Sequence, residues 1–309
     1  MHVLEISTKN RTAGKSEMKS IMVGDIPIAY VDEGDGPPII LVHCSSGSHR
    51  MWRALIDELK GSYRVIAPDL IGYGRSGRWP PTRLFDAGME AQILMLLASV
   101  AGEPAHFVGH SYGGAISLEA VRLMQGRARG MTLIEPVAFH LLRAAGKDAE
   151  WQAVEGVING VTEAVARGDR KGAAAVYMGF WLGRFQWWMS PRKLKENIIE
   201  TIDKVALEFL AVRWSAAPPM DVYTALDVPT LLIHGAKTRK PSLAVTQILA
   251  GLLPDVRVAA VPGAGHMSPL THRDAVNRLV LAHIEECAAG KADSLTVRPG
   301  LENIVGLSG

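Results

Sequence analysis

Residues 105–114 read Ala105-His106-Phe107-Val108-Gly109-His110-Ser111-Tyr112-Gly113-Gly114. The middle of this stretch is a G-x-S-x-G pattern, with a short apolar run before it and a helix-compatible segment, residues 114–124, after it. A strand, a tight turn and a helix in this order hold a serine in a strained backbone conformation, with its hydroxyl exposed. Glycines flank the serine because side chains would clash in the turn. The stretch therefore predicts a nucleophilic serine, Ser111; the alternative is a glycine-rich turn whose serine caps a helix.

The composition is that of a globular protein. Of 309 residues, 48% are hydrophobic and 21% charged, which supports a sizeable core and argues against wholesale disorder. A net charge of +2 is too small to indicate a nucleic-acid or membrane partner. Two distant cysteines, Cys44 and Cys287, do not make a disulfide scaffold. The first 20 residues lack the apolar core of a signal peptide and no apolar run could span a membrane, so we expect a cytoplasmic protein.

Strand-like and helix-like segments alternate along residues 17–139, which predicts a mainly parallel α/β sheet with right-handed crossovers. Residues 139–227 break this rhythm with helical patterns, and the alternation resumes from 229. We therefore expect a core in two parts, residues 1–138 and 228–287, with a helical insertion at 139–227 and a tail at 288–309. The expected strands are 20–23, 26–31, 38–43, 64–68, 105–108, 131–134, 229–234 and 256–261, and the expected core helices are 51–60, 85–101, 114–124, 242–253 and 275–286.

The insertion is rich in tryptophan: Trp151, Trp181, Trp187, Trp188 and Trp214. These rings either pack the insertion onto the sheet or line an apolar lid over a site. Trp181, Trp187 and Trp188 are the candidates for substrate contact. The polar tail is either disordered or an arm onto a neighbouring subunit, which makes a homodimer one expectation.

Four motifs resemble those of the α/β-hydrolase family, in the order that the family shows. They are Leu-Val-His-Cys-Ser at 41–45, Asp-Leu-Ile-Gly-Tyr-Gly-Arg-Ser at 69–76, Gly-His-Ser-Tyr-Gly-Gly at 109–114 and Gly-Ala-Gly-His-Met at 263–267. The resemblance covers about residues 20–287. It implies an α/β-hydrolase fold, with a mostly parallel eight-stranded sheet, a helical cap insertion and a site at the carboxyl ends of the strands.

His266 is the candidate base, since a serine hydroxyl needs one to attack a carbonyl at neutral pH. It lies among small residues after the last expected strand, and it follows the nucleophile, as the family's order of serine, acid and histidine requires. Of the other histidines, His43 is expected to support the oxyanion loop, although it is also a candidate for substrate contact. His110 is expected to point away from the serine, and His234 either lines the site or is buried with a partner.

The resemblance also implies an oxyanion hole made of two backbone N–H groups. One belongs to Tyr112, the residue after the nucleophile, and the other, by position, to Ser45. Many members of the family have glycine where this chain has Cys44. The cysteine side chain either narrows the approach to the oxyanion hole or goes with a slightly different loop backbone. Cys44 is therefore also a candidate for substrate contact. Cys44 beside His43 is also an alternative nucleophile, but the intact serine motif argues against it.

The acid is missing from its usual place. In many α/β-hydrolases an aspartate follows the strand that here ends near 234, but residues 230–253 hold no carboxylate, and Thr238 stands there instead. Some members, such as certain haloalkane dehalogenases, carry the acid after the strand that follows the nucleophile helix. Glu135 occupies that position and is the predicted acid. A carboxylate from the insertion, Asp148 or Asp221, and a degenerate, inactive site are the alternatives.

A serine in this turn argues against dehalogenase and epoxide-hydrolase chemistry, which need a carboxylate nucleophile. Serine, histidine and an oxyanion hole point to acyl transfer. We therefore expect a carboxylic ester hydrolase with a Ser-His-Glu triad, acting on a small ester that is apolar or aromatic. Lactone or C–C bond hydrolysis on the same triad, and a non-catalytic small-molecule binder, are the rivals. No sequence feature calls for a metal, nucleotide or flavin.

Overall fold

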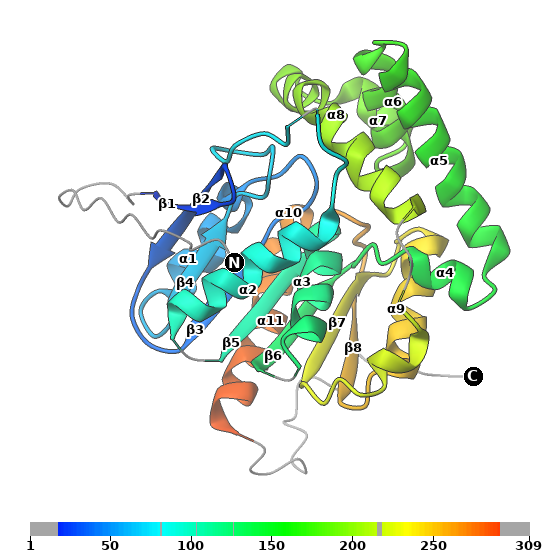
Figure 1. The fold of residues 1–309 in the computed structure, drawn as a ribbon. Helices are drawn as coiled ribbons and strands as arrows, with labels where there is room; N and C mark the ends of the chain where they lie inside the picture. Colours follow the sequence, from blue (N-terminus) through cyan, green and yellow to red (C-terminus); the bar gives the residue numbers. More distant parts are fainter. Residues whose placement is uncertain (1–17, 81, 103, 126, 215–217, 291–309) are drawn as a thin grey trace.

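The computed structural model describes residues 18–80, 82–102, 104–125, 127–214 and 218–290, so most of the predicted tail lies outside the described residues. Eight strands form one sheet in the order β1-β2-β4-β3-β5-β6-β7-β8 (Figure 1). β1 and β2 pair antiparallel, as do β2 and β4, and the remaining neighbours are parallel. The predicted mostly parallel eight-stranded sheet is therefore confirmed. Its strands are β1 (Lys19–Val23), β2 (Ile26–Glu33), β3 (Pro38–Val42), β4 (Arg64–Pro68), β5 (Ala105–His110), β6 (Ala128–Ile134), β7 (Thr230–Gly235) and β8 (Val256–Val261).

The central strands are largely buried because helices cover both faces of the sheet. All residues of β3 and β5 are buried. Successive side chains of a strand point to opposite faces, so Ile40 and Val42 belong to one apolar cluster and Ile39 and Leu41 to the other.

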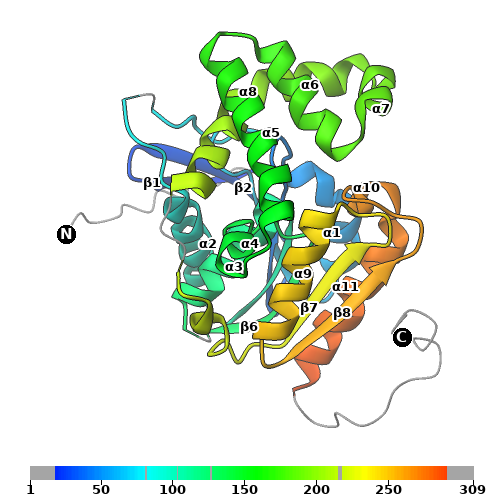
Figure 2. The same cartoon turned by 90° about the vertical axis from the view of Figure 1, so that its right-hand side faces the viewer.

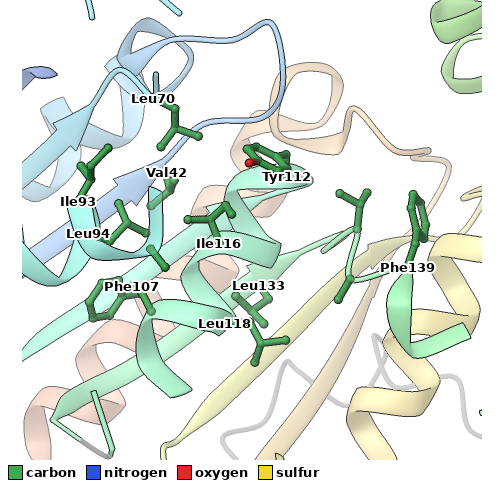
Figure 3. Close-up of a cluster of buried hydrophobic side chains, with 14 of the residues drawn as sticks. Val42, Leu70, Ile93, Leu94, Phe107, Tyr112, Ile116, Leu118, Leu133 and Phe139 are labelled. Atoms are coloured by element: carbon green, nitrogen blue, oxygen red, sulfur yellow. The ribbon is translucent and has the colours of Figure 1, made fainter. Parts of the chain in front are cut away.

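The two clusters define three layers. One face packs against α2 (Ala87–Ala101), α3 (Tyr112–Leu123) and α9 (Lys240–Leu252), and the other against α1 (Arg53–Leu59) and α11 (Arg273–Ala289). Figure 3 shows Ile93 and Leu94 of α2 and Ile116 of α3 close to Val42 and Phe107 of the sheet. Two 3-10 turns, His49–Trp52 and Met220–Tyr223, and the short helix α10 (Ser268–Thr271) complete the core connections.

Helices α4 to α8 lie between β6 and β7 in the chain, within the stretch where the alternating pattern breaks. They are α4 (His140–Ala144), α5 (Asp148–Ala166), α6 (Arg170–Trp181), α7 (Arg184–Met189) and α8 (Arg192–Trp214). Figures 1 and 2 show α5 to α8 gathered beyond one end of the sheet. Among the helices of the described residues, none is long and apolar enough to cross a membrane.

Candidate active site

Ser111 sits in the turn between β5 and α3, in a backbone conformation that is unusual for a residue with a side chain. Its φ is 56° and its ψ is −119°, and a non-glycine residue in such a region costs about 1–3 kcal/mol. The surrounding chain holds this conformation. The Ser111 N–H donates to the Ile134 carbonyl at 2.9 Å, and the Ser111 carbonyl accepts from the Val137 N–H at 3.2 Å.

The two glycines of the motif are required by close packing of the turn. A Cβ at Gly109 would lie 2.5 Å from the Gly113 carbonyl oxygen, and one at Gly113 would lie 2.5 Å from the Val42 carbonyl oxygen. Both contacts are with backbone atoms, which cannot move aside without shifting α3 or β3. The structure also starts α3 at Tyr112, two residues before the predicted start, because the helix begins directly after the serine.

His266 lies in the loop between β8 and α10 and faces the serine. Its Nε2 is 2.9 Å from Ser111 Oγ, and the residue is only 5% exposed. His110 holds the loop, because its Nε2 donates to the His266 carbonyl at 2.9 Å. Burial, together with the neighbouring His266, lowers the pKa of His110 to about 3, which favours the neutral ring at neutral pH.

Glu135 follows β6 directly and faces the other side of the His266 ring. Its Oε2 lies 3.1 Å from His266 Nδ1, and its Oε1 accepts from the Gly235 N–H at 2.8 Å. Thr238, which stands where the sequence resemblance led us to look for an aspartate, donates its hydroxyl to the same Oε2. Burial raises the pKa of Glu135, but the hydrogen bonds from His266, Thr238 and Gly235 outweigh it, so the pKa lies below its ordinary value.

The structure thus brings Ser111, His266 and Glu135 into one hydrogen-bonded chain. The alternative acids, Asp148 and Asp221, are exposed at the starts of α5 and of the second 3-10 turn. A buried carboxylate that keeps its charge beside a histidine is the arrangement that orients the ring and stabilises its protonated form.

The two predicted oxyanion residues lie at the ends of neighbouring parallel strands. Tyr112 is the first residue of α3 (Figure 3), and the N–H groups of a first helical turn have no partner within the helix. Ser45 lies in the loop after β3. His43 braces that loop, since its Nδ1 donates to the Cys44 carbonyl at 2.7 Å and its Nε2 accepts from the Leu70 N–H at 2.9 Å. With both nitrogens engaged and 0% exposure, His43 fits the loop role and has no group left for a substrate.

Cys44 is a buried free cysteine in the loop after β3. It is 8% exposed, and burial raises the pKa of its thiol to about 12. The thiolate is the nucleophilic form of cysteine, so almost none is present at neutral pH. The geometry therefore argues against Cys44 as an alternative nucleophile.

The three tryptophans that were candidates for substrate contact lie in different surroundings. Trp181, the last residue of α6, stacks on His266 with ring centroids 3.6 Å apart and planes 17° apart. Trp187 is half-buried, and Lys195 Nζ lies over its ring, 5.9 Å from the ring centroid. Trp188 is 69% exposed, and its ring lies beside that of Phe185. Of these three tryptophans, Trp181 is the one whose ring stacks on a member of the predicted triad.

Some neighbours of the site were missed by sequence reasoning. Thr238 was not predicted to contact the acid, although its place in the loop where an aspartate was expected was a signal that it lies near His266 and Glu135. The contacts of α8 with the loop at Ser45, described below, had no such signal.

His234, at the end of β7, is half-exposed and donates from Nδ1 to the Gly235 carbonyl at 3.1 Å.

A family profile described as the alpha/beta hydrolase fold matches residues 37–273. The chain belongs to this family. The magnesium-chelatase 30 kDa subunit of Rhodobacter capsulatus is 28% identical to this α/β hydrolase over 280 residues, 85% of this chain and 93% of that protein. A 2-hydroxymuconate semialdehyde hydrolase of Pseudomonas putida is 23% identical over 84% of this chain and 90% of its own length. The crystal structure of a thermophilic esterase from Thermogutta terrifontis matches with a TM-score of 0.66 and 24% identity, over 85% of this chain and 94% of the esterase.

Proposed function

We propose that this α/β hydrolase cleaves carboxylic esters through an acyl-enzyme on Ser111. The observation that carries the proposal is the chain of contacts Ser111 Oγ–His266 Nε2 at 2.9 Å and His266 Nδ1–Glu135 Oε2 at 3.1 Å. Each member is buried, so the contacts act in a medium where electrostatic interactions are stronger than in water.

The first half-reaction forms the acyl-enzyme. As Ser111 Oγ attacks the ester carbonyl carbon, His266 Nε2 takes the hydroxyl proton, and Glu135 stabilises the imidazolium through Nδ1–H. The Ser45 and Tyr112 N–H groups stabilise the oxyanion of the tetrahedral intermediate. When the intermediate collapses, the carbonyl reforms, the C–O bond to the alcohol breaks, and the alcohol leaves with the proton from Nε2.

The second half-reaction reverses the roles with water. His266 Nε2 takes a proton from a water molecule, and the resulting hydroxide adds to the acyl carbon on Ser111. Collapse of this intermediate breaks the bond to Ser111 Oγ, which recovers the proton from Nε2, and the carboxylic acid is released. These steps use the side chains of the triad, two backbone N–H groups and water.

The apolar side chains of the helical insertion favour an apolar or aromatic substrate. Trp181 covers one face of His266 and packs against the apolar core cluster that includes Tyr177 and Met178 of the same helix. We propose that helices α5 to α8 form a cap and that Trp181 is part of the wall of the substrate pocket. The contact of an aromatic wall with the base favours small esters whose acyl or alcohol group is itself apolar.

C–C bond hydrolysis is the second candidate, favoured by the relative whose name gives 2-hydroxymuconate semialdehyde as its substrate. The same serine, histidine and acid could serve that reaction, so the pocket decides between the two. The test is a turnover panel of p-nitrophenyl esters of increasing acyl length, lactones and a vinylogous diketone acid. We expect the short or aromatic esters to give the highest kcat/KM, lost in Ser111→Ala. Turnover of the diketone acid alone would favour the second candidate, and no turnover of any compound by folded protein would contradict both.

A further inference from the structure

A stripe of polar side chains on α8 contacts the loop that carries Ser45. Asn197, Thr201, Lys204 and Glu208 are spaced by four, three and four residues, so they share one face of the helix. Asn197 Nδ2 donates to the Ser46 carbonyl at 2.8 Å, and Thr201 Oγ1 donates to Ser46 Oγ at 2.7 Å. Ser46 itself has a φ of 56°, which a free loop would not hold without support.

Glu208 is the next contact along this stripe and reaches Ser45 itself. Its Oε2 accepts from Ser45 Oγ at 2.5 Å, while its Oε1 accepts from Tyr73 Oη at 2.7 Å and Lys204 Nζ at 2.8 Å. Glu208 is 2% exposed, and both of its carboxylate oxygens accept hydrogen bonds. A charged acceptor makes each of these bonds stronger than a neutral one.

Lys204 extends the network to the second oxyanion residue. Its Nζ also lies 3.3 Å from Glu90 Oε2, and Glu90 accepts the hydroxyl of Tyr112 on the same oxygen. The ammonium is enclosed by the rings of Phe85, Tyr112 and Tyr73 at 4.4, 5.0 and 5.1 Å. Gly72 leaves room for this side chain, since a Cβ there would lie 3.3 Å from Lys204 Cγ.

The side chains of Ser45 and Tyr112 are therefore tied to one buried network that α8 completes. We propose that Glu208 and Lys204 are positioning residues that fix the two oxyanion N–H groups relative to each other, so that α8 is required for transition-state stabilisation. This role rests on the proposed acyl transfer. An oxyanion hole works only when its donors are held in place before charge develops, and the network ties the loop that carries Ser45 to the helix that begins at Tyr112.

The role predicts a loss in kcat at nearly constant KM, because the oxyanion forms only after the substrate has bound. Removing one oxyanion donor elsewhere costs about 10²–10³ in kcat, and displacing a donor should cost less. We therefore expect Glu208→Ala to lower kcat about 10–100-fold and Ser45→Ala about 10-fold. Ser45→Ala keeps its backbone N–H and loses only the hydroxyl that Glu208 holds. Glu208→Gln, which keeps an acceptor oxygen, should retain more activity than Glu208→Ala.

The matched control is Asp203→Asn, on the same helix. Asp203 pairs with Arg170 of α6 at the surface and does not contact Ser45. We expect its kcat to stay within about twofold of wild type. In a double-mutant cycle, Glu208→Ala should have a much smaller effect on kcat in the Ser45→Ala background, because the shared contact is already gone. A trifluoromethyl ketone, whose serine adduct carries an oxyanion, should lose affinity in parallel with kcat/KM.

Several outcomes would overturn this role. The first is that Glu208→Ala and Ser45→Ala fold and have the same kcat as Asp203→Asn. The second is that these two variants raise KM but leave kcat unchanged. The third is that their effects on kcat are strictly additive in the double-mutant cycle. If Glu208→Ala does not fold, Ser45→Ala and the ketone affinity decide the matter. If the wild-type protein hydrolyses esters and these variants are equally active, the positioning role is wrong but the proposed function stands. If the folded wild-type protein is inactive on esters, the proposed function is wrong as well.

Discussion

Thr238 donates its hydroxyl to Glu135 at the same oxygen, Oε2, that faces His266. The residue at the usual aspartate position and the relocated acid therefore meet at one point. The carboxylate lies at the end of β6, and the threonine in the loop after β7 serves as its hydrogen-bond donor. Because Thr238 contacts the same carboxylate oxygen that faces His266 Nδ1, an exchange of the acid between the two positions can be tested.

Moving the acid back should restore part of the activity. Glu135→Gln should keep the fold and lower kcat by about 10⁴, the effect of losing the triad carboxylate elsewhere. Adding Thr238→Asp to that variant places a carboxylate beside the same ring nitrogen, and we expect it to recover at least about 10-fold in kcat. Steady-state turnover of a p-nitrophenyl ester measures both effects. Near wild-type activity in Glu135→Gln would show that Glu135 is not the acid.

The threonine hydroxyl should matter by itself. Thr238→Val removes a donor from a buried carboxylate, and a hydrogen bond to a charged group contributes about 1.5–3 kcal/mol. We expect kcat to fall about 10-fold, with the pKa of Glu135 rising because one of the interactions that lower it is gone. Thr238→Ser, which keeps the hydroxyl, is the control and should remain close to wild type. Equal activity in the valine and serine variants would assign the hydroxyl no role.

Trp181 should support the base by stacking. Its ring lies 3.6 Å from that of His266, and aromatic pairs contribute about 0.5–1.5 kcal/mol beyond the area they bury. We expect Trp181→Leu to lower kcat/KM about 2–10-fold and Trp181→Phe to lower it less, since a ring is retained. The comparison of the two variants on one aromatic and one short aliphatic ester separates stacking from substrate contact. Leucine and phenylalanine variants with the same kcat/KM would contradict the stacking role.

His110 should make the protein less stable in acid. Its pKa in the folded protein is about 3, below the ordinary value of about 6.5, so the unfolded chain binds the extra proton between these values. Stability contributed by the neutral ring is present above about pH 6.5 and is lost as the pH falls toward 3, at up to about 1.4 kcal/mol per pH unit. The free energy of unfolding, measured with urea at pH 7, 6 and 5, should fall less steeply with decreasing pH in His110→Gln than in wild type. Identical slopes would show that His110 is not the buried group responsible.

Much of the fold could be predicted because buried strands leave an unmistakable signal. Residues 64–68 were predicted as a strand and form β4 at the same boundaries, and the resemblance to α/β-hydrolases fixed the sheet around them. The stretch 139–227 was predicted only as helical, because the pattern there did not separate one helix from the next.

Some residues of the candidate site could be predicted from local motifs, and others are placed there only by tertiary packing. Ser111 and His266 stand in motifs, and Glu135 was found because the usual acid position was empty. The contact of Glu208 with Ser45 spans 163 residues and depends on how α8 lies against the core, which no local pattern encodes. Trp181 was one of three similar candidates, and only the packing of α6 against the loop of His266 distinguishes it.

The most direct test of acyl transfer on Ser111 is to locate a covalent adduct. The folded protein is treated with a fluorophosphonate, digested, and analysed by mass spectrometry, beside Ser111→Ala and Cys44→Ala under the same conditions. We expect one adduct, on the fragment that contains Ser111, present in wild type and Cys44→Ala and absent in Ser111→Ala. An adduct on another residue, or no adduct in folded wild-type protein, would contradict the assignment of Ser111 as the nucleophile.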